Sequence, residues 1–318
     1  MRCCMWQWLV LSIVTVCLVS ALLLYVVSRL LLSPKKVAYD KTYKLGIQKG
    51  EIDDHVFQTI KKEEIYIRSY HGYKLHGLLF PVANSKKVII IAHGIKWSLF
   101  GSFKYVEMFQ KRGFHVLLCD HRFHGLSGGA YTSFGYYEKD DLMAWIDYAT
   151  TRFGSKAFIG LLGESLGAAS ALEVSKRDSR VRFCIADCAF SDFKALLKLR
   201  LELDLKIRFY SLIDVISYLV KLRHGWGFPE ISPIKGLEKI KTPILFIHGK
   251  RDSFIPLQMT IEMFKRKKGK KTLFIVPEAG HAEAYNTDPK GYEKKVIEFI
   301  KDIEQACPGS LFKEKQQV

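Results

Sequence analysis

The interior of this 318-residue sequence contains no proline-rich, glycine-rich or low-complexity linker, and no internal repeat stands out. A division into two domains is therefore not indicated, and we expect one large domain behind an amino-terminal appendage. Composition excludes disorder over most of the length, because 48% of the residues are hydrophobic and 13% are aromatic, which is ample for a sizeable core.

Paired cysteines of the C-x-x-C type are also absent, which argues against a metal site built on such a motif. The seven cysteines divide between the amino-terminal apolar region and the body of the chain: Cys3, Cys4 and Cys17, then Cys119, Cys184, Cys188 and Cys307. Two of the body cysteines, Cys119 and Cys184, sit in apolar runs, as buried free thiols do. Nothing in this pattern requires an oxidising compartment.

Acidic residues are fewer than basic ones: the sequence has 32 Asp and Glu and 49 Lys and Arg, which gives a formal net charge of +17. Such a charge favours contact with an anionic surface, and nucleic acid and acidic phospholipid both qualify. The basic residues form no recognised motif for reading nucleic acid, so we expect no nucleic-acid partner. A salt-dependent gel shift would reverse this interpretation.

A long apolar run lies at the amino terminus, from Leu9 to Leu32. A bilayer is crossed by about 20 helical residues, and Trp6 and Trp8 would lie at one interface. A cleaved signal peptide is the alternative, because residues 19–21 (Val-Ser-Ala) are small, but the apolar run continues well past them. We therefore expect residues 1–32 to form an uncleaved transmembrane anchor.

The charges that flank this segment indicate its orientation. Arg2 is the only basic side chain before it, whereas five lie at or beyond its other end: Arg29, Lys35, Lys36, Lys41 and Lys44. The positive-inside rule then places the large domain on the cytoplasmic side. The opposite orientation stays open, because short basic amino-terminal tails also remain inside in single-pass proteins.

Beyond the anchor, residues 33–62 are polar and mixed in charge, and we expect a tether with one short amphipathic helix. Two alternating runs, Glu64–Arg68 and Tyr73–Phe80, predict an antiparallel hairpin. Later apolar runs predict strands at 88–92, 115–119, 157–162, 182–186, 244–247 and 272–276, with helices at 103–111, 138–152, 168–174, 257–267 and 289–305. This alternation predicts an α/β fold over residues 63–305, with a mostly parallel sheet between helices, and leaves 306–318 as a tail.

An insertion at about residues 191–239 is rich in leucine, isoleucine and phenylalanine, and its second half has helical periodicity. Helices at the carboxyl edge of such a sheet would roof a site there, so we expect a small cap. An extra core helix is the alternative. The basic and apolar composition would also suit contact with a membrane surface.

The segment Gly163-Glu164-Ser165-Leu166-Gly167 matches the nucleophile elbow G-x-S-x-G. It follows a short apolar run and precedes a run of small helix-forming residues, so it is expected to turn a strand sharply into a helix. Such a turn exposes the serine hydroxyl at the carboxyl end of the sheet, beside the amino end of a helix. The context distinguishes Ser165 from an ordinary glycine-bracketed serine.

A serine hydroxyl needs a base within hydrogen-bond reach, and that base needs an orienting acid. Asp252 follows the next-to-last predicted strand and His281 follows the last one, which gives the order serine, acid, histidine. Asp187 also follows a strand and remains an alternative acid.

Four motifs together resemble the α/β-hydrolase superfamily, including bacterial membrane-anchored hydrolases and feruloyl or cinnamoyl esterases: His93-Gly94 after a strand, residues 120–128 (DHRFHGLSG), the elbow, and the Asp252 and His281 loops. The resemblance covers about Glu63 to Lys301. It implies Ser165 as nucleophile, His281 as general base and then acid, and Asp252 as the orienting carboxylate. It also implies the backbone N–H groups of Ile95 and Leu166 as an oxyanion hole, and no metal or organic cofactor.

Several other polar residues in these motifs are interpreted as structural. His121 and His124 have a spacing that suits a metal, but no carboxylate or thiol cluster completes a site. Asp120 and Arg122 are expected to brace loops near the elbow. Glu164 lies within the elbow and either tunes the site or serves packing and the helix start.

The expected function is hydrolysis of a carboxylic ester or related acyl bond through an acyl-enzyme. A serine peptidase of the prolyl-oligopeptidase-like or aminopeptidase type would use the same three residues, and a non-catalytic membrane-anchored binding module is the alternative from another class. Anchor and cap together predict partly apolar substrates taken from, or near, the bilayer, and we expect the apolar side chains of the cap to form an acyl-binding wall. The sequence gives no prediction of oligomeric state.

Overall fold

Eight strands form one mixed sheet in the computed structural model, which describes residues 2–306. The strand order is β1-β2-β4-β3-β5-β6-β7-β8, and every neighbouring pair from β4 to β8 is parallel. The strands are β1 (Glu63–Arg68), β2 (Lys74–Phe80), β3 (Lys87–Ala92), β4 (Phe114–Cys119), β5 (Phe158–Glu164), β6 (Val181–Asp187), β7 (Ile244–Gly249) and β8 (Lys271–Val276). The predicted α/β-hydrolase fold class is confirmed.

The strand sequences explain this order. The expected hairpin is present, with Tyr66 opposite His76 in the antiparallel β1–β2 pair. All residues of β4, β5 and β7 are buried, as their continuous apolar runs require for central strands covered on both faces.

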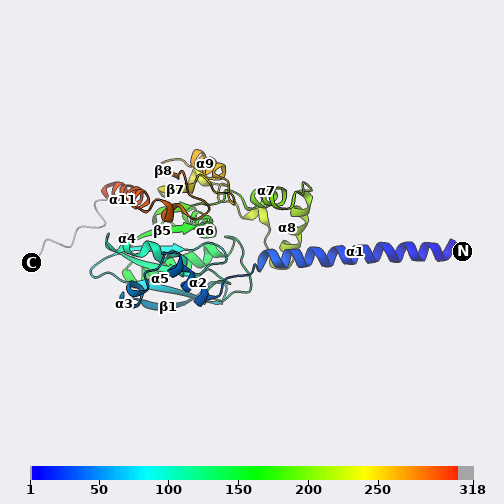
Figure 1. The fold of residues 1–318 in the computed structure, drawn as a ribbon, viewed down its shortest axis with the longest axis horizontal. Coiled ribbons are helices and arrows are strands. Elements are labelled where there is room, and N and C mark those ends of the chain that lie inside the picture. The colour runs from blue at the N-terminus through cyan, green and yellow to red at the C-terminus, as the bar shows by residue number, and fades with distance from the viewer. Residues whose placement is uncertain (1, 307–318) are drawn as a thin grey trace, which may run out of the picture.

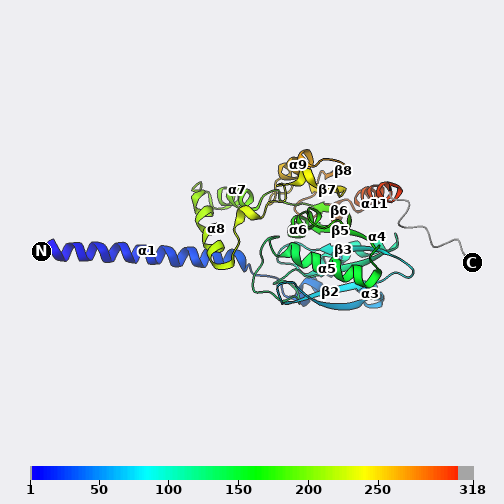
Figure 2. The same ribbon diagram turned by 180° about the vertical axis from the view of Figure 1, so that it is seen from behind.

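Helices cover both faces of the sheet (Figures 1 and 2). The helices are α1 (Arg2–Leu32), α2 (Tyr39–Gln48), α3 (Asp54–Thr59), α4 (Val106–Gln110), α5 (Glu138–Phe153), α6 (Leu166–Ser175), α7 (Phe193–Leu205), α8 (Ser211–His224), α9 (Leu257–Arg266), α10 (Ala284–Thr287) and α11 (Pro289–Ala306), with 3₁₀ turns η1 (Leu99–Tyr105), η2 (Phe228–Glu230) and η3 (Leu237–Lys239). The helix predicted over 103–111 is divided between η1 and α4, since 3₁₀ turns commonly begin short helices.

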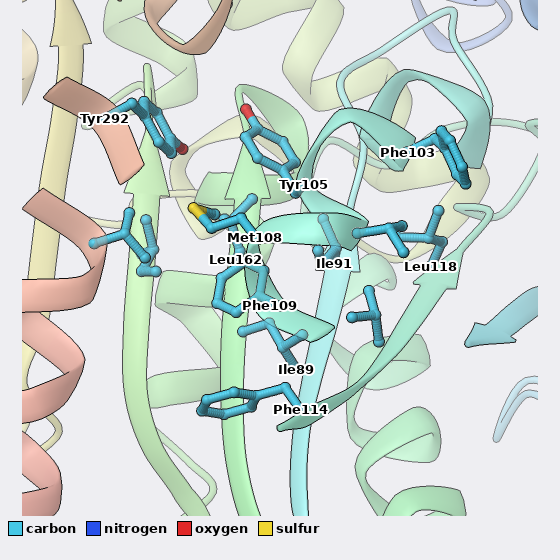
Figure 3. Packing of buried hydrophobic residues seen from close by; sticks show 14 of the residues in the cluster. Ile89, Ile91, Phe103, Tyr105, Met108, Phe109, Phe114, Leu118, Leu162 and Tyr292 are labelled. Carbon is cyan, nitrogen blue, oxygen red and sulfur yellow. The ribbon is translucent and has the colours of Figure 1, made fainter. Parts of the chain in front are cut away.

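The hydrophobic core has one layer on each side of the sheet. Figure 3 shows the first layer, where Tyr105 and Phe109 from η1 and α4 pack over Ile91 and Leu162 of the central strands. The second layer joins α5, α6 and α9 to the opposite face, with Trp145 as its largest fully buried side chain. The burial of both faces fixes the carboxyl ends of the strands, where the candidate site lies.

Residues 33–62 do not form the expected tether with one short helix. Two helices, α2 and α3, pack on the body, because Tyr39, Tyr43 and Phe57 contact the aromatic ring of Phe100. Ile52, in the connection between the two helices, is also buried. Only residues 33–38 connect α1 to this packed region.

The amino-terminal helix α1 is unbroken and projects away from the body (Figures 1 and 2). An 18-residue window within its stretch Trp6–Leu32 has a mean hydropathy of 2.7, and the stretch is long and apolar enough to cross a membrane, a test that a signal sequence also passes. The side chains from Trp6 to Leu23 are exposed, whereas Ser28 and Leu32 are buried against the rest of the chain.

The predicted cap insertion forms two helices, α7 and α8, on the side of the body from which α1 projects (Figure 1). Its leucine-rich first half is helix α7, although the leucines alternate as in a strand. The cap has its own apolar cluster, in which Phe193, Ile216 and Trp226 pack with Leu166 at the start of α6 and with Leu32 at the end of α1. Of the predicted tail 306–318, all but Ala306 lies outside the described residues, as does Cys307.

Candidate active site

Ser165 occupies a strained turn between β5 and α6. Its φ of 54° and ψ of −109° lie in a region that L-residues rarely adopt. The flanking glycines are required by close backbone approach: a Cβ at Gly163 would lie 2.2 Å from the carbonyl carbon of Gly167, and a Cβ at Gly167 would lie 2.1 Å from the carbonyl oxygen of Ala92. The chain therefore turns as the elbow motif predicts and presents the serine at the end of the sheet.

The structure brings Ser165, His281 and Asp252 together from three loops. His281 Nε2 lies 3.0 Å from Ser165 Oγ, and His281 Nδ1 lies 2.7 Å from Asp252 Oδ2. With Nδ1–H donating to the carboxylate, Nε2 is free to accept the serine hydroxyl proton. The Asp252 side chain is fully buried and the imidazole is about one quarter exposed, so the serine–histidine pair is the part open to a substrate.

Asp252 is held by its own loop. Its Oδ1 accepts hydrogen bonds from the N–H groups of Phe254 and Ile255, both at 2.8 Å, and its Oδ2 lies 3.2 Å from His248 Nε2. Burial raises the pKa of Asp252, but the contacts with His248 and His281 outweigh it and hold the pKa well below its usual range. The carboxylate is therefore ionised and oriented toward His281.

Asp187, the alternative acid, has another position. It is the last residue of β6, and its backbone oxygen accepts the N–H of Ser165 at 2.8 Å. Neither carboxylate oxygen has a hydrogen-bond partner within 3.5 Å among the described residues, although the Tyr292 hydroxyl is close enough to lower the pKa of this carboxyl. Burial, reinforced by the nearby Glu164 charge, raises the pKa of Asp187 to about 7. The structure thus pairs His281 with Asp252 and not with Asp187.

The two expected oxyanion donors lie on either side of the serine. Leu166 is the first residue of α6, where N–H groups have no carbonyl partner within the helix. Ile95 lines the cavity at the end of β3, and its N–H makes no hydrogen bond to any described residue. Both groups are thus available to a substrate oxygen.

A cavity of about 560 Å³ opens beside Ser165 and His281. It is lined by Lys49, Glu51, His93, Gly94, Ile95, Trp97, Gly101, Lys104, Glu164, Ser165, Phe254, His281, Ala282, Glu283, Asn286 and Thr287. No residue of the cap insertion 191–239, which the structure describes throughout, is in this lining. The expectation that the cap supplies an acyl-binding wall is therefore wrong for this cavity, because α8 packs on α1 and the apolar side chains of the cap cluster with Leu166 and Ala169 of α6 instead.

A buried charge cluster forms one wall of the cavity. Lys104 Nζ lies 2.8 Å from Glu164 Oε1 and 3.8 Å from Glu51 Oε1. Burial lowers the pKa of Lys104, but the Glu164 and Glu51 charges more than offset this and raise it. Tyr105 donates its hydroxyl to Glu164 at 3.0 Å, and Asn286 donates to Glu51 at 2.6 Å. Glu164 thus links the elbow to the cavity wall.

Sequence reasoning considered Glu164 but missed the other polar residues of this wall. Lys104 comes from η1 and Glu51 from the connection between α2 and α3, far from any recognisable motif. The only indication in the sequence was that Glu164 would need a partner if it were buried.

The histidines near the site form hydrogen bonds with backbone groups. His93 Nε2 accepts the N–H of His121 at 3.1 Å, and His121 Nε2 donates to the carbonyl of His93 at 3.0 Å. His124 Nδ1 donates to the carbonyl of Arg122. Burial lowers the pKa of all three histidines, and that of His121 falls to about 3, so they are neutral.

Asp120 and Arg122 brace the same region. Asp120 accepts hydrogen bonds from the N–H groups of Leu99 and Leu126 and lies 2.6 Å from His76 Nδ1. The Arg122 guanidinium lies 4.5 Å from the ring of Tyr137. These contacts fit the structural interpretation of the 120–128 motif.

Among the described residues, Cys188, Asp252 and His281 form the group with ligand atoms close enough to suit a metal ion. Burial raises the pKa of the Cys188 thiol well above its usual range, which keeps it protonated and makes it a poor ligand. The other two side chains are already hydrogen-bonded to each other.

Comparison with known proteins identifies a matching family and several similar proteins. The sequence model of the prolyl oligopeptidase family matches residues 100–305. The uncharacterized protein YqkD of Bacillus subtilis is 34% identical over 280 residues, which cover 87% of this chain and 92% of that protein. The uncharacterized protein YfhR of Escherichia coli is 26% identical over 250 residues, or 75% of this chain and 80% of that one.

Solved structures share the fold. Two crystal forms of the Pyrococcus furiosus esterase Pf2001 match 79% of this chain, with TM-scores of 0.65 and 0.63, identities of 24% and 26%, and coverage of 95% and 96% of the esterase. The acylaminoacyl peptidase of Pyrococcus horikoshii matches 83% of this chain and 44% of its own, with a TM-score of 0.57 and 16% identity.

Proposed function

Because this chain belongs to the prolyl oligopeptidase family of α/β hydrolases, we propose that it is a serine hydrolase cleaving a carboxylic ester or related acyl bond. Ser165 is the nucleophile, His281 the general base and acid, and Asp252 the orienting carboxylate. The observation that carries the proposal is the hydrogen-bonded chain of the three side chains, with distances of 3.0 Å and 2.7 Å.

The first half of the reaction follows from this geometry. His281 Nε2 takes the proton of Ser165 Oγ as the oxygen attacks the acyl carbon. Negative charge then develops on the former carbonyl oxygen, and the N–H groups of Ile95 and Leu166 stabilise it. The ionised Asp252 stabilises the imidazolium. His281 donates its proton to the departing alkoxide, and an acyl-enzyme on Ser165 remains.

The second half repeats these roles with water. His281 takes a proton from a water molecule, whose oxygen attacks the acyl carbon, and then returns a proton to Ser165 Oγ as the carboxylic acid leaves. None of these steps uses a group outside the chain and its substrates.

Ester cleavage is the first candidate. The structural match covers 95% of the Pyrococcus furiosus esterase but 44% of the acylaminoacyl peptidase. Peptide cleavage is the second candidate, supported by the prolyl oligopeptidase family match. The wall of Lys104, Glu164 and Glu51 makes part of the cavity polar, which supports acyl groups with a polar end rather than a fully apolar one.

We also propose that α1 is an uncleaved membrane anchor. Its apolar stretch Trp6–Leu32 has the required length, and the helix continues without a break past the small residues 19–21. The domain lies on the cytoplasmic side if the basic residues after α1 follow the positive-inside rule.

A substrate panel tests the proposed reaction. Purified full-length protein is assayed with p-nitrophenyl acyl esters of increasing chain length and with aminoacyl anilides. Preferential turnover of esters supports the first candidate, and preferential turnover of anilides supports the peptidase. A correctly folded protein that turns over neither class would contradict the proposal and favour a non-catalytic binding module.

A further inference from the structure

The last two turns of α1 are held by the cap. Arg223 of α8 donates to Ser28 Oγ at 3.0 Å, and its guanidinium lies 4.4 Å from the ring of Tyr25. Leu24 and Leu32 pack against the apolar cluster of the cap, where Leu32 is 2% exposed. The cap is therefore fixed beside α1 at a defined point along this helix.

That point coincides with the end of the exposed apolar stretch. From Trp6 to Leu23 the helix is about 27 Å long at its usual rise, close to the hydrocarbon thickness of about 30 Å. If these residues cross a bilayer, its surface lies close to Leu24, where the cap begins to contact α1. Figures 1 and 2 show α8 running across α1 rather than along it, as a helix lying on that surface would.

The outer side of the cap exposes large apolar side chains, which we call the cap face. The cap face consists of Leu203, Leu205, Ile207 and Phe209 around the connection from α7 to α8, and Val215, Tyr218 and Leu222 on α8. Phe209 is 68% exposed, Tyr218 61% and Leu222 66%. The α8 residues recur at helical spacing, so they lie along one side of the helix. So many large exposed apolar side chains on one small cap indicate an interaction surface.

Charges around the cap face identify its partner. The acidic side chains nearby are engaged within the cap: Glu202 with Arg208, Asp204 with Arg200, and Asp214 with Lys194. Lys206 and Lys221 make no ion pair with any described residue, although Lys206 is one of the charges that lower the pKa of Glu202. Both lysines remain available to an anionic surface. Apolar side chains flanked by free lysines suit the interface of an anionic bilayer. A second copy of a chain with a net charge of +17 would instead be repelled.

We propose that the cap face inserts into the interfacial layer of the membrane that α1 crosses. This inference rests on the proposed anchor and adds a second contact, so that α1 and the cap together fix the orientation of the domain. Contact with lipid is continuous from the exposed side of α1 onto the cap. The cavity beside Ser165 then lies at a set height above the lipid, since the cap and the body are packed together through Leu166 and Phe193.

Site-specific photo-crosslinking of the full-length protein tests the proposal. Phe209 or Tyr218 is replaced by p-benzoylphenylalanine, and the protein is reconstituted in vesicles of phosphatidylcholine and phosphatidylglycerol that contain radiolabelled phospholipid. Val56→p-benzoylphenylalanine is the control, because Val56 is 42% exposed on α3, which lies at the end of the body away from α1 in Figures 1 and 2. Leu18→p-benzoylphenylalanine, at an exposed position of α1, reports on the anchor independently.

The proposal predicts lipid adducts at positions 18, 209 and 218 and at least tenfold less lipid adduct at position 56. Adducts at 18 without adducts at 209 and 218 contradict the cap contact and leave the anchor intact. Absence of adducts at position 18 contradicts the anchor itself, whatever the cap does. Crosslinks from 209 or 218 to a second protein chain, in place of lipid, assign the cap face to an oligomer interface and overturn the proposal.

Discussion

The buried carboxylates around Ser165 differ in what they contact, so we expect them to have different roles. Asp252 lies 2.7 Å from His281, whereas the side chain of Asp187 bonds to no described residue. Asp252→Asn should lower kcat by about 10⁴-fold, because an amide leaves the imidazole in the wrong tautomer and the imidazolium unstabilised. Asp187→Asn should lower it by less than about tenfold. Ester turnover by the two purified variants checks the ranking, and a reversal would transfer the role to Asp187.

Ionisation of Asp187 should instead make the stability of the protein depend on pH. Its folded pKa of about 7 lies above the unfolded value, so the folded state binds this proton more tightly. Protonated Asp187 contributes at most about 4 kcal/mol to the free energy of unfolding. This contribution is complete below about pH 4 and is lost as pH rises to about 7. Asn resembles the protonated form and does not ionise. The melting temperature of Asp187→Asn should therefore exceed that of the wild type at pH 8 more than at pH 5. An equal difference at both pH values would contradict this assignment.

At the level of residues, the sequence predicted the positions that follow strands but not the cavity wall. Ser165, Asp252 and His281 could be found because each follows a recognisable apolar run in the order typical of this fold. Lys104 and Glu51 could not, because they reach the site from outside the strand ends and depend on tertiary packing. The position of the free N–H of Ile95 could be expected from the resemblance but not from the residues alone.

Among the elements, buried strands were the most predictable. The runs at β3, β4 and β5 are continuous and apolar, which fits only a sheet covered on both faces. Helices α2 and α3 were missed as packed elements because their apolar residues are spread through a polar sequence. The cap lies at the expected carboxyl edge of the sheet but does not line the cavity, because periodicity identifies a helix and not the surface on which it packs.

Helix α7 of the cap contacts the loop that carries Asp252 through Arg200. Its Nη1 donates to the carbonyl of Ser253 at 2.7 Å, and its guanidinium lies 5.1 Å from the ring of Phe254, which contacts His281. Arg200→Ala removes a hydrogen bond worth about 1 kcal/mol that positions this loop. If the activation free energy rises by that amount, kcat falls about fivefold. KM should stay unchanged, since Arg200 does not line the cavity.

Arg152→Ala is the matched control for this substitution, because it removes a partly exposed arginine that pairs with Glu63 away from the site. Its kcat should equal that of the wild type. If Arg200→Ala changes only the melting temperature, or raises KM at constant kcat, then Arg200 does not position the acid loop.

For the whole molecule, the projecting helix and the packed body predict an integral membrane protein. Full-length protein should stay in the membrane pellet after alkaline carbonate extraction and should retain its amino terminus by intact mass, because Trp6–Leu32 is long enough to span. Phe209→Ser should remain in the pellet too, since the anchor does not depend on the cap. Release of the full-length protein into the soluble fraction, or a mature chain that begins after residue 21, would contradict an uncleaved anchor.

The nucleophilic role of Ser165 is the central claim, and covalent labelling measures it most directly. The wild-type protein, treated with a fluorophosphonate probe, should carry one adduct that peptide mass spectrometry places on Ser165, and acid denaturation beforehand should prevent labelling. Ser165→Ala, shown to be folded by its melting temperature, should not be labelled and should lose about 10⁶-fold in ester turnover. Labelling that persists in this variant, or an adduct on another residue of the wild type, would contradict the account.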